Sequence, residues 1–184
     1  MQAGVPSGGK CPSWTSRSPQ RLLTAVPSVT DRVISPVRSA SDAGVYLDSS
    51  ALVKLYVPET ESDTLDALLR GRRDLMISEL AITEVLSAVA RRRREGSLSD
   101  EQAYLIRDAL LEDAASESFQ RLELSPVTHR EAERLLLSTR VLPLRTLDAL
   151  HVALALEADA KHVLTFDMRM REAAVYAGLS ALLI

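Results

Sequence analysis

The stretch GVYLDSSALVKLYVPE, residues 44–59, decides how we interpret this chain. The apolar-leaning run VYL leads directly into Asp48, and such a run before a turn signal is typical of a short buried strand. Two serines follow, and Leu52, Leu55 and Tyr56 then recur on one helical face. Asp48 or a following serine would cap this helix by accepting its free backbone N–H groups. A carboxylate between a strand and a helix lies where open α/β sheets place their ligands, so Asp48 is the first candidate functional residue.

The rest of the patterned region alternates strand-like and helix-like segments in the same way. This alternation favours a parallel sheet that is covered by helices on both faces. The predicted fold class is therefore α/β, a three-layer α/β/α sandwich with a central, mostly parallel sheet. Besides the helix after Asp48, we expect strands over residues 45–47, 75–77, 119–124, 162–166 and 181–184, and helices over residues 61–70, 78–94, 99–117, 128–139, 143–158 and 167–177.

Composition limits the class of protein further. The chain has 184 residues, of which 46% are hydrophobic and 26% charged, enough for one packed domain and an appendage. Its net charge of −3 does not indicate a nucleic-acid or membrane-surface protein. The single cysteine, Cys11, excludes an internal disulfide framework and fits a reducing compartment. Because no apolar run approaches the roughly 20 residues of a membrane-spanning helix, we expect a cytoplasmic protein without membrane association.

Residues 1–43 differ from the patterned region. They are rich in proline, glycine and serine and lack a sustained apolar period, so we expect a disordered extension ahead of one domain at residues 44–184. Two other interpretations of this segment stay open. Its Arg- and Ser-rich, acid-poor composition resembles an organellar transit peptide. The alternative that we favour is translation from an upstream start, with the native protein beginning near Val45, because the pattern begins so abruptly there.

Asp148 is a carboxylate in an unexpected place. It lies within LRTLDALHVALAL, residues 144–156, which is apolar on nearly every face and predicts a central buried helix. A carboxylate in such a helix faces a large desolvation penalty unless it binds a metal or forms an ion pair. Arg145 and His151, each three residues away, are the candidates for an ion pair.

Glu84 and Asp167 have ordinary explanations when each is taken alone. Glu84 lies at the edge of the apolar stripe of helix 78–94, where glutamates are usually solvated. Asp167 repeats the arrangement of Asp48, and helix capping alone accounts for it. Taken together with Asp48 and Asp148, they indicate a shared site. Asp48 and Asp167 end parallel strands at one edge of the sheet, and Glu84 and Asp148 lie on helices that can flank this edge. Oxygen-only clusters suit hard cations such as Mg²⁺ or Mn²⁺, and four carboxylates without a cation would repel one another.

Four segments carry these carboxylates in chain order: YLDSSALVKLYVPE, SELAITEVLSAVARR, RTLDALHVALAL and LTFDMRMREAAVYAG. In order and approximate spacing they resemble PIN-domain ribonucleases, most of all the bacterial VapC-type toxins of toxin–antitoxin pairs. The resemblance covers residues 44–184, and residues 1–43 have no counterpart in it. It implies an α/β/α sandwich, Mg²⁺- or Mn²⁺-dependent cleavage of single-stranded or loop RNA, and inhibition by a small cognate antitoxin. We also expect a homodimer.

Carried over position by position, the resemblance gives the acidic quartet of Asp48, Glu84, Asp148 and Asp167. Asp48 and Asp148 match the positions most directly associated with metal. A metal held by carboxylates can polarise a phosphodiester oxygen and lower the pKa of bound water for in-line attack. Because Mg²⁺ keeps several waters and usually takes one or two protein carboxylates, we expect Asp48 and Asp148 as direct ligands. Glu84 and Asp167 would then position water or a second ion.

Residues around the quartet supply candidate substrate contacts. The patterned domain is acidic, so RNA needs basic side chains at the rim of the site. For the arginine run 91–94, the alternative is a solvated helix end that complements the helix dipole. His129, His151 and His162 share no metal spacing, and we assign them structural roles. The predicted substrate contacts are Ser49, Thr165, Arg91, Arg92, Arg169 and Arg171.

Two functions remain as alternatives to a metal-dependent endoribonuclease that acts as the toxin of a type II toxin–antitoxin system. The first is a catalytically silent PIN-like module that binds RNA or a partner, against which the intact quartet argues. The second is another Mg²⁺-dependent phosphohydrolase, such as a DNA nuclease or a phosphatase. Its aspartyl-phosphate type is disfavoured because Ser50 stands two residues after Asp48, where that chemistry uses a second acid.

Overall fold

The computed structural model describes residues 44–138 and 143–182, so the predicted extension at residues 1–43 lies outside the described residues. The described strands are β1 (Val45–Leu47), β2 (Leu75–Ser78), β3 (Gln120–Leu122), β4 (His162–Leu164) and β5 (Ser180–Leu182). They form one sheet in the order β3-β2-β1-β4-β5, and every pairing between neighbours is parallel. The predicted parallel sheet is confirmed.

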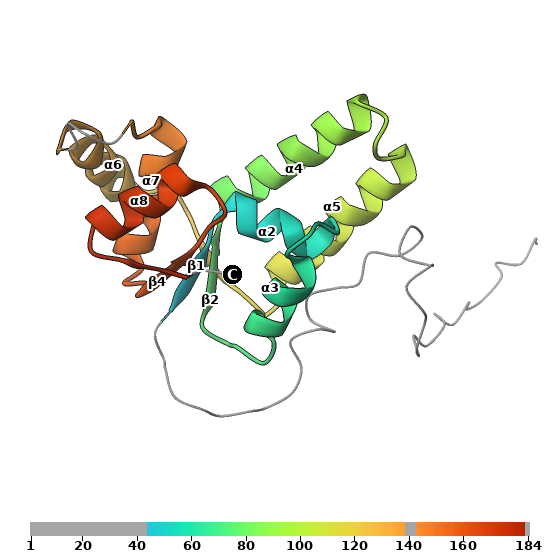
Figure 1. Cartoon of the computed structure of the whole chain (residues 1–184), viewed down its shortest axis with the longest axis horizontal. Helices are drawn as coiled ribbons and strands as arrows, with labels where there is room; N and C mark the ends of the chain where they lie inside the picture. The colour runs from blue at the N-terminus through green and yellow to red at the C-terminus, as the bar shows by residue number, and fades with distance from the viewer. Residues whose placement is uncertain (1–43, 139–142, 183–184) are drawn as a thin grey trace, which may run out of the picture.

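Seven helices flank this sheet in the described part of the chain: α2 (Ser49–Tyr56), α3 (Ser62–Leu69), α4 (Glu79–Arg94), α5 (Asp100–Ala115), α6 (Pro126–Ser138), α7 (Thr146–Glu157) and α8 (Met168–Tyr176). Figure 1 shows α6, α7 and α8 on one side of the sheet and α2, α3 and α5 on the other. Successive strand residues enter different cores, because strand side chains alternate in direction. Val45 and Leu47 pack with residues of α2–α5, whereas Tyr46 packs with residues of α6–α8. The described chain is therefore the three-layer sandwich that the sequence predicts.

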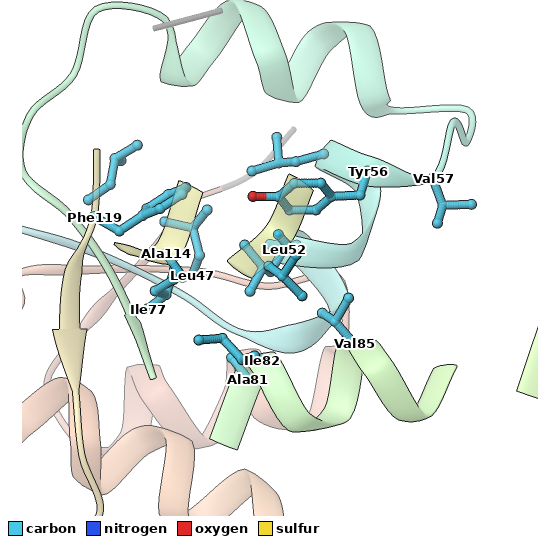
Figure 2. Close-up of a cluster of buried hydrophobic side chains, with 14 of the residues drawn as sticks. Leu47, Leu52, Tyr56, Val57, Ile77, Ala81, Ile82, Val85, Ala114 and Phe119 are labelled. Carbon is cyan, nitrogen blue, oxygen red and sulfur yellow. The ribbon is translucent and has the colours of Figure 1, made fainter. Parts of the chain in front are cut away.

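The core on the α2 side joins the first strand–helix unit to the rest of the domain. Figure 2 shows part of it, where Leu52 and Tyr56 of α2 belong to one buried cluster with Ile77 of β2 and with Phe119. Leu52 and Ile77 have no exposed surface. Burying a side chain of this size contributes about 1.5–3 kcal/mol relative to its exposed state.

Local capping signals account for several helix starts. Asp48 caps α2, Ser78 caps α4, and Ser99 with Gln102 forms the predicted capping box of α5. Gly96 follows α4 with a φ of 75°, a left-handed conformation that glycine adopts without a steric penalty. These element boundaries follow from residues close to them in sequence.

The start of α7 differs from the prediction. The helix begins at Thr146, three residues later than expected from Pro143, so Asp148 lies in its first turn. Its side chain is half-buried, and the predicted position in the middle of a buried helix is wrong. A first-turn carboxylate is favoured by the helix dipole, which reduces the desolvation problem that singled out Asp148.

The strand predicted over residues 119–124 is confined to Gln120–Leu122 at the edge of the sheet. Within residues 44–138 and 143–182, no helix has the length and apolar character to cross a membrane.

Replacing Leu52 with alanine tests the packing of α2. We expect Leu52→Ala to lower the free energy of unfolding by about 2–5 kcal/mol, because it removes buried methyl groups and leaves a cavity. Urea denaturation measures the change. Leu137→Ala is the control, since Leu137 is 86% exposed and its loss should change stability by less than about 0.5 kcal/mol. Equal effects of the two changes would contradict the assigned packing.

Candidate active site

The candidate site lies at the carboxyl ends of β1 and β4, where the chain order of the sheet reverses. From β1 the chain crosses to β2 on one side, and β4 enters on the other side. Open α/β sheets bind their ligands in the crevice at such a switch point. Asp48 directly follows β1, and Asp167 follows β4 after two intervening residues. Their predicted placement at one edge of the sheet is therefore what the structure shows.

A cavity of about 400 Å³ opens at this edge. All four carboxylates of the quartet line it, although they come from four different parts of the chain. The cavity has an acidic interior with apolar side chains beside it. The lining residues are Asp48, Ser49, Ser50, Glu84, Arg145, Thr146, Leu147, Asp148, His151, Asp167 and Met170.

Asp48 is the most buried member of the quartet, at 3% exposed. Its Oδ1 accepts hydrogen bonds from the Ala51 N–H at 2.9 Å and from the Ser50 hydroxyl at 2.8 Å. Its Oδ2 accepts the Thr165 hydroxyl at 2.7 Å. Burial raises the pKa of Asp48 above its ordinary value of 3.8, although the hydrogen bonds from Thr165, Ala51 and Ser50 act in the opposite direction. The carboxylate is thus rigidly held in an environment that disfavours its charge.

Glu84 forms a contact that joins α4 to α7. Its Oε2 lies 2.5 Å from Nε2 of His151. Burial alone would raise the pKa of Glu84, but its hydrogen bond with His151 and a hydrogen bond from Ser49 hold it below its ordinary value. Glu84 is therefore a carboxylate with a specific partner at the cavity wall, whereas sequence alone leaves a solvated glutamate as its usual state.

His151 has a second partner that the sequence does not indicate. Its Nδ1 lies 2.6 Å from the Tyr46 hydroxyl, which in turn lies 2.8 Å from the Ser78 hydroxyl. Burial raises the pKa of Tyr46 far above its ordinary value. A tyrosine within a buried strand needs a partner for its hydroxyl, and this is the one sequence signal that points to the contact.

Asp148 and Asp167 both interact with the backbone at a helix start. Asp148 Oδ2 accepts the Arg145 N–H at 3.2 Å. Asp167 Oδ1 accepts the N–H groups of Arg169 and Met170 at 2.8 and 3.3 Å, so it caps α8 as expected. Among the described residues, neither Arg145 nor His151 forms the ion pair considered for Asp148, and His151 contacts Glu84 instead.

The residues present fit a hydrated hard cation better than a fully protein-bound one. Within the described ranges, no three His, Cys, Asp or Glu side chains approach closely enough to enclose a metal ion. Mg²⁺ usually keeps several waters and takes one or two protein carboxylates, so it does not need such a cage. The cavity has room for those waters, and its charged acceptors are all carboxylates.

Arg91 and Arg92, which we predicted at the rim of the site, do not lie at the cavity. Arg92 forms an ion pair with Glu59. These arginines occupy the end of α4 that extends away from the strands in Figure 1, roughly 11 Å along the helix from Glu84. Arg145 is the only lysine or arginine among the described residues that line the cavity. Its position three residues before Asp148 is the sequence feature that could have placed Arg145 at the site.

Arg169 and Arg171 lie on α8, beside the last carboxylate of the quartet. Arg169 Nε is 4.0 Å from Asp167 Oδ1. Arg171 is half-buried, and its Nε has no hydrogen-bond partner within the described structure. Neither side chain is among those that line the cavity.

Comparison with known proteins places this geometry in a family. The model of the PIN domain matches residues 45–176. The chain belongs to the PIN-domain family. It is 37% identical over 144 residues to Ribonuclease VapC46 of Mycobacterium tuberculosis, a match that covers 76% of this chain and 97% of that protein. The resemblance recognised from the four sequence segments is confirmed.

Solved structures share the PIN fold at low sequence identity. FitAcB from Neisseria gonorrhoeae has a TM-score of 0.61 and 16% identity, with 76% of this chain and 96% of that chain covered. VapC20 of M. tuberculosis, described as a sarcin-ricin loop cleaving toxin, has a TM-score of 0.55 and 16% identity, with 71% and 95% covered. PAE2754 from Pyrobaculum aerophilum has a TM-score of 0.55 and 21% identity, with 78% and 87% covered.

Replacing Asp48 with asparagine tests its electrostatic environment. Because the pKa of Asp48 is raised in the folded protein, its contribution to stability is greatest below the ordinary value of 3.8 and is lost as pH rises through the raised pKa. In EDTA, Asp48→Asn should therefore be more stable than wild type at pH 7, and the difference should shrink toward about pH 4.

Urea denaturation across this pH range measures the difference between the two proteins. Glu112→Gln is the control, because Glu112 is exposed on α5 and its replacement should leave the pH profile unchanged. If Asp48→Asn is less stable than wild type at every pH, the prediction is wrong. The hydrogen bonds to the Asp48 anion would then stabilise the fold by more than its burial destabilises it.

Proposed function

We propose that this protein is a metal-dependent endoribonuclease and the toxin of a type II toxin–antitoxin system. One observation carries the proposal: four carboxylates from separate elements line one cavity at the switch point of a PIN-domain sheet. The 37% identity to a protein named as a ribonuclease, over almost all of that protein's length, supports the same activity here. The residues of the cavity supply the acidic groups that such a reaction needs.

Asp48 and Asp148 would hold a Mg²⁺ or Mn²⁺ ion, with Glu84 and Asp167 placing water around it. When bound, the cation neutralises charge on the phosphodiester and makes a water molecule more acidic for in-line attack. The Thr165 and Ser50 hydroxyls fix the orientation of Asp48. Thr165 is buried, so we propose that it positions Asp48 and does not contact the substrate.

Three helix N-termini converge on the cavity and favour negative charge there. Asp48 caps α2, Asp167 caps α8, and Asp148 lies in the first turn of α7. The partial positive charge of a helix N-terminus stabilises nearby carboxylates and also attracts phosphate groups. This backbone field lets an RNA phosphate approach a site whose side chains are mainly acidic.

We propose Arg145 as the principal phosphate contact. It is exposed, lines the cavity and precedes α7 directly. An arginine fork can bind two oxygens of one phosphate, which would hold the RNA backbone beside the carboxylates. Ser49, which also lines the cavity, is a second candidate for contact with the RNA.

We also propose a cognate antitoxin that inserts a cationic side chain into the cavity. The acidic interior and the apolar side chains of Leu147 and Met170 suit a short segment that carries an arginine between apolar residues. Its guanidinium would pair with a carboxylate in place of the cation, so the antitoxin and Mn²⁺ should compete. A homodimer remains a prediction.

Loss of RNA cleavage tests the assignment of the two direct ligands. Cleavage of a structured RNA should require Mg²⁺ or Mn²⁺ and stop in EDTA. Asp48→Ala and Asp148→Ala should each lower kcat by more than the roughly 100-fold that loss of an outer-shell contact causes. Glu112→Ala, at an exposed site on α5, is the control. Cleavage that persists in the Asp48→Ala, Asp148→Ala double variant would refute the proposed activity and indicate a contaminating nuclease.

Arg145→Gln tests the phosphate contact against a matched arginine. Removing one contact should weaken RNA binding and reduce the slope of log K against log salt by about 0.7. Arg91→Gln removes the same charge at the far end of α4 and should leave both quantities nearly unchanged. Fluorescence anisotropy at several salt concentrations, with Ca²⁺ in place of Mg²⁺, gives the affinities. Equal losses for the two variants would show that Arg145 contributes only net charge.

A further inference from the structure

A chain of four hydrogen-bonded side chains runs from the core to the wall of the cavity. Ser78 Oγ lies 2.8 Å from the Tyr46 hydroxyl, which lies 2.6 Å from His151 Nδ1, and His151 Nε2 lies 2.5 Å from Glu84 Oε2. Ser78, Tyr46 and His151 are buried, whereas Glu84 is partly exposed and lines the cavity. The chain thus begins in the core and ends at one member of the quartet.

The partners of these groups assign the direction of the hydrogen bonds. Ser78 Oγ accepts the Ala81 N–H at 3.0 Å, and its own proton is available to donate to Tyr46. The Tyr46 hydroxyl, protonated at neutral pH, then donates to Nδ1 of His151. In this arrangement the neutral ring of His151 has its proton on Nε2 and donates it to the Glu84 carboxylate. In the other neutral tautomer, a bare ring nitrogen would face a carboxylate oxygen at 2.5 Å, which is repulsive.

We propose that His151 and Tyr46 are positioning residues for Glu84: Tyr46 fixes the ring of His151 in its Nε2–H form, and His151 holds the carboxylate at the cavity wall. This inference rests on the proposed nuclease function. Glu84 lies outside the apolar stripe of α4, and three other carboxylates line the same cavity. The donors to Glu84 are His151, which is buried, and Ser49, which is half-buried. Hydrogen-bond donors around the carboxylates of a metal site commonly fix their orientation in this way.

The first test is the tautomer of His151, which does not depend on nuclease activity. Long-range ¹H–¹⁵N NMR spectra of the full chain distinguish the two neutral ring forms. Wild type should show the Nε2–H form, and Tyr46→Phe should show a mixture because Nδ1 loses its donor. Tyr56→Phe is the matched control, since it removes a buried tyrosine hydroxyl that donates to Asp113, remote from the cavity. An Nδ1–H form in wild type would overturn the proposal.

The second test compares two replacements of His151 by Mn²⁺ titration and RNA turnover. His151→Leu keeps bulk but removes the donor, and it should lower Mn²⁺ affinity or kcat by about 10–100-fold with little change in the KM for RNA. His151→Gln offers an amide N–H near the position of Nε2 and should recover most of that loss. A purely structural role would lower the melting temperature of both variants without this difference between them.

Tyr46→Phe completes the second test. It should lower Mn²⁺ affinity or kcat by about tenfold, whereas Tyr56→Phe should leave both unchanged while also losing a buried hydroxyl. Equal behaviour of the two tyrosine variants would overturn the role of Tyr46. If wild type cleaves RNA and His151→Leu matches it, the positioning role fails alone. If wild type neither binds Mn²⁺ nor cleaves RNA, the proposed function fails and the positioning role with it, whatever the tautomer.

Discussion

The structure depends on gathering negative charge at one edge of a parallel sheet. Asp48 is almost completely buried where β1 ends, and burial raises its pKa even though three groups donate hydrogen bonds to it. Glu84, Asp148 and Asp167 line the same cavity. Each carboxylate added to such a cluster makes the others harder to ionise. The fold must therefore supply compensating positive charge or be destabilised by its own site.

The compensation comes from hydrogen-bond donors of both side chains and backbone. The Ala51 N–H and the Thr165 hydroxyl donate to Asp48, and the first N–H groups of α8 donate to Asp167. His151 donates to Glu84. These contacts hold the acceptors in place but do not neutralise them. A cluster of partly buried carboxylates lowers the stability of the fold, and such a loss is a common cost of an active site. A divalent cation would reduce the remaining repulsion between the carboxylates.

The sequence predicts features that adjacent residues encode better than contacts between residues far apart in the chain. The strand–Asp–helix units around Asp48 and Asp167 are encoded by adjacent residues, and a parallel sheet then brings them to one edge. The start of α7 was misjudged because the apolar run of residues 144–156 continues through its boundary. The contact between Glu84 and His151 joins residues 67 positions apart, and that between Tyr46 and His151 joins residues 105 apart. Such pairs are set by packing between layers, which no local spacing reveals.

The central claim is that the quartet forms one cation site at the switch point. Crystals of the protein grown with Mn²⁺ and measured at the manganese absorption edge test it most directly, because anomalous scattering locates the ion independently of the protein map. We expect a manganese peak inside the cavity, with Asp48 and Asp148 as direct ligands and water completing the coordination. A manganese peak elsewhere, with the cavity free of anomalous signal at saturating Mn²⁺, would contradict it.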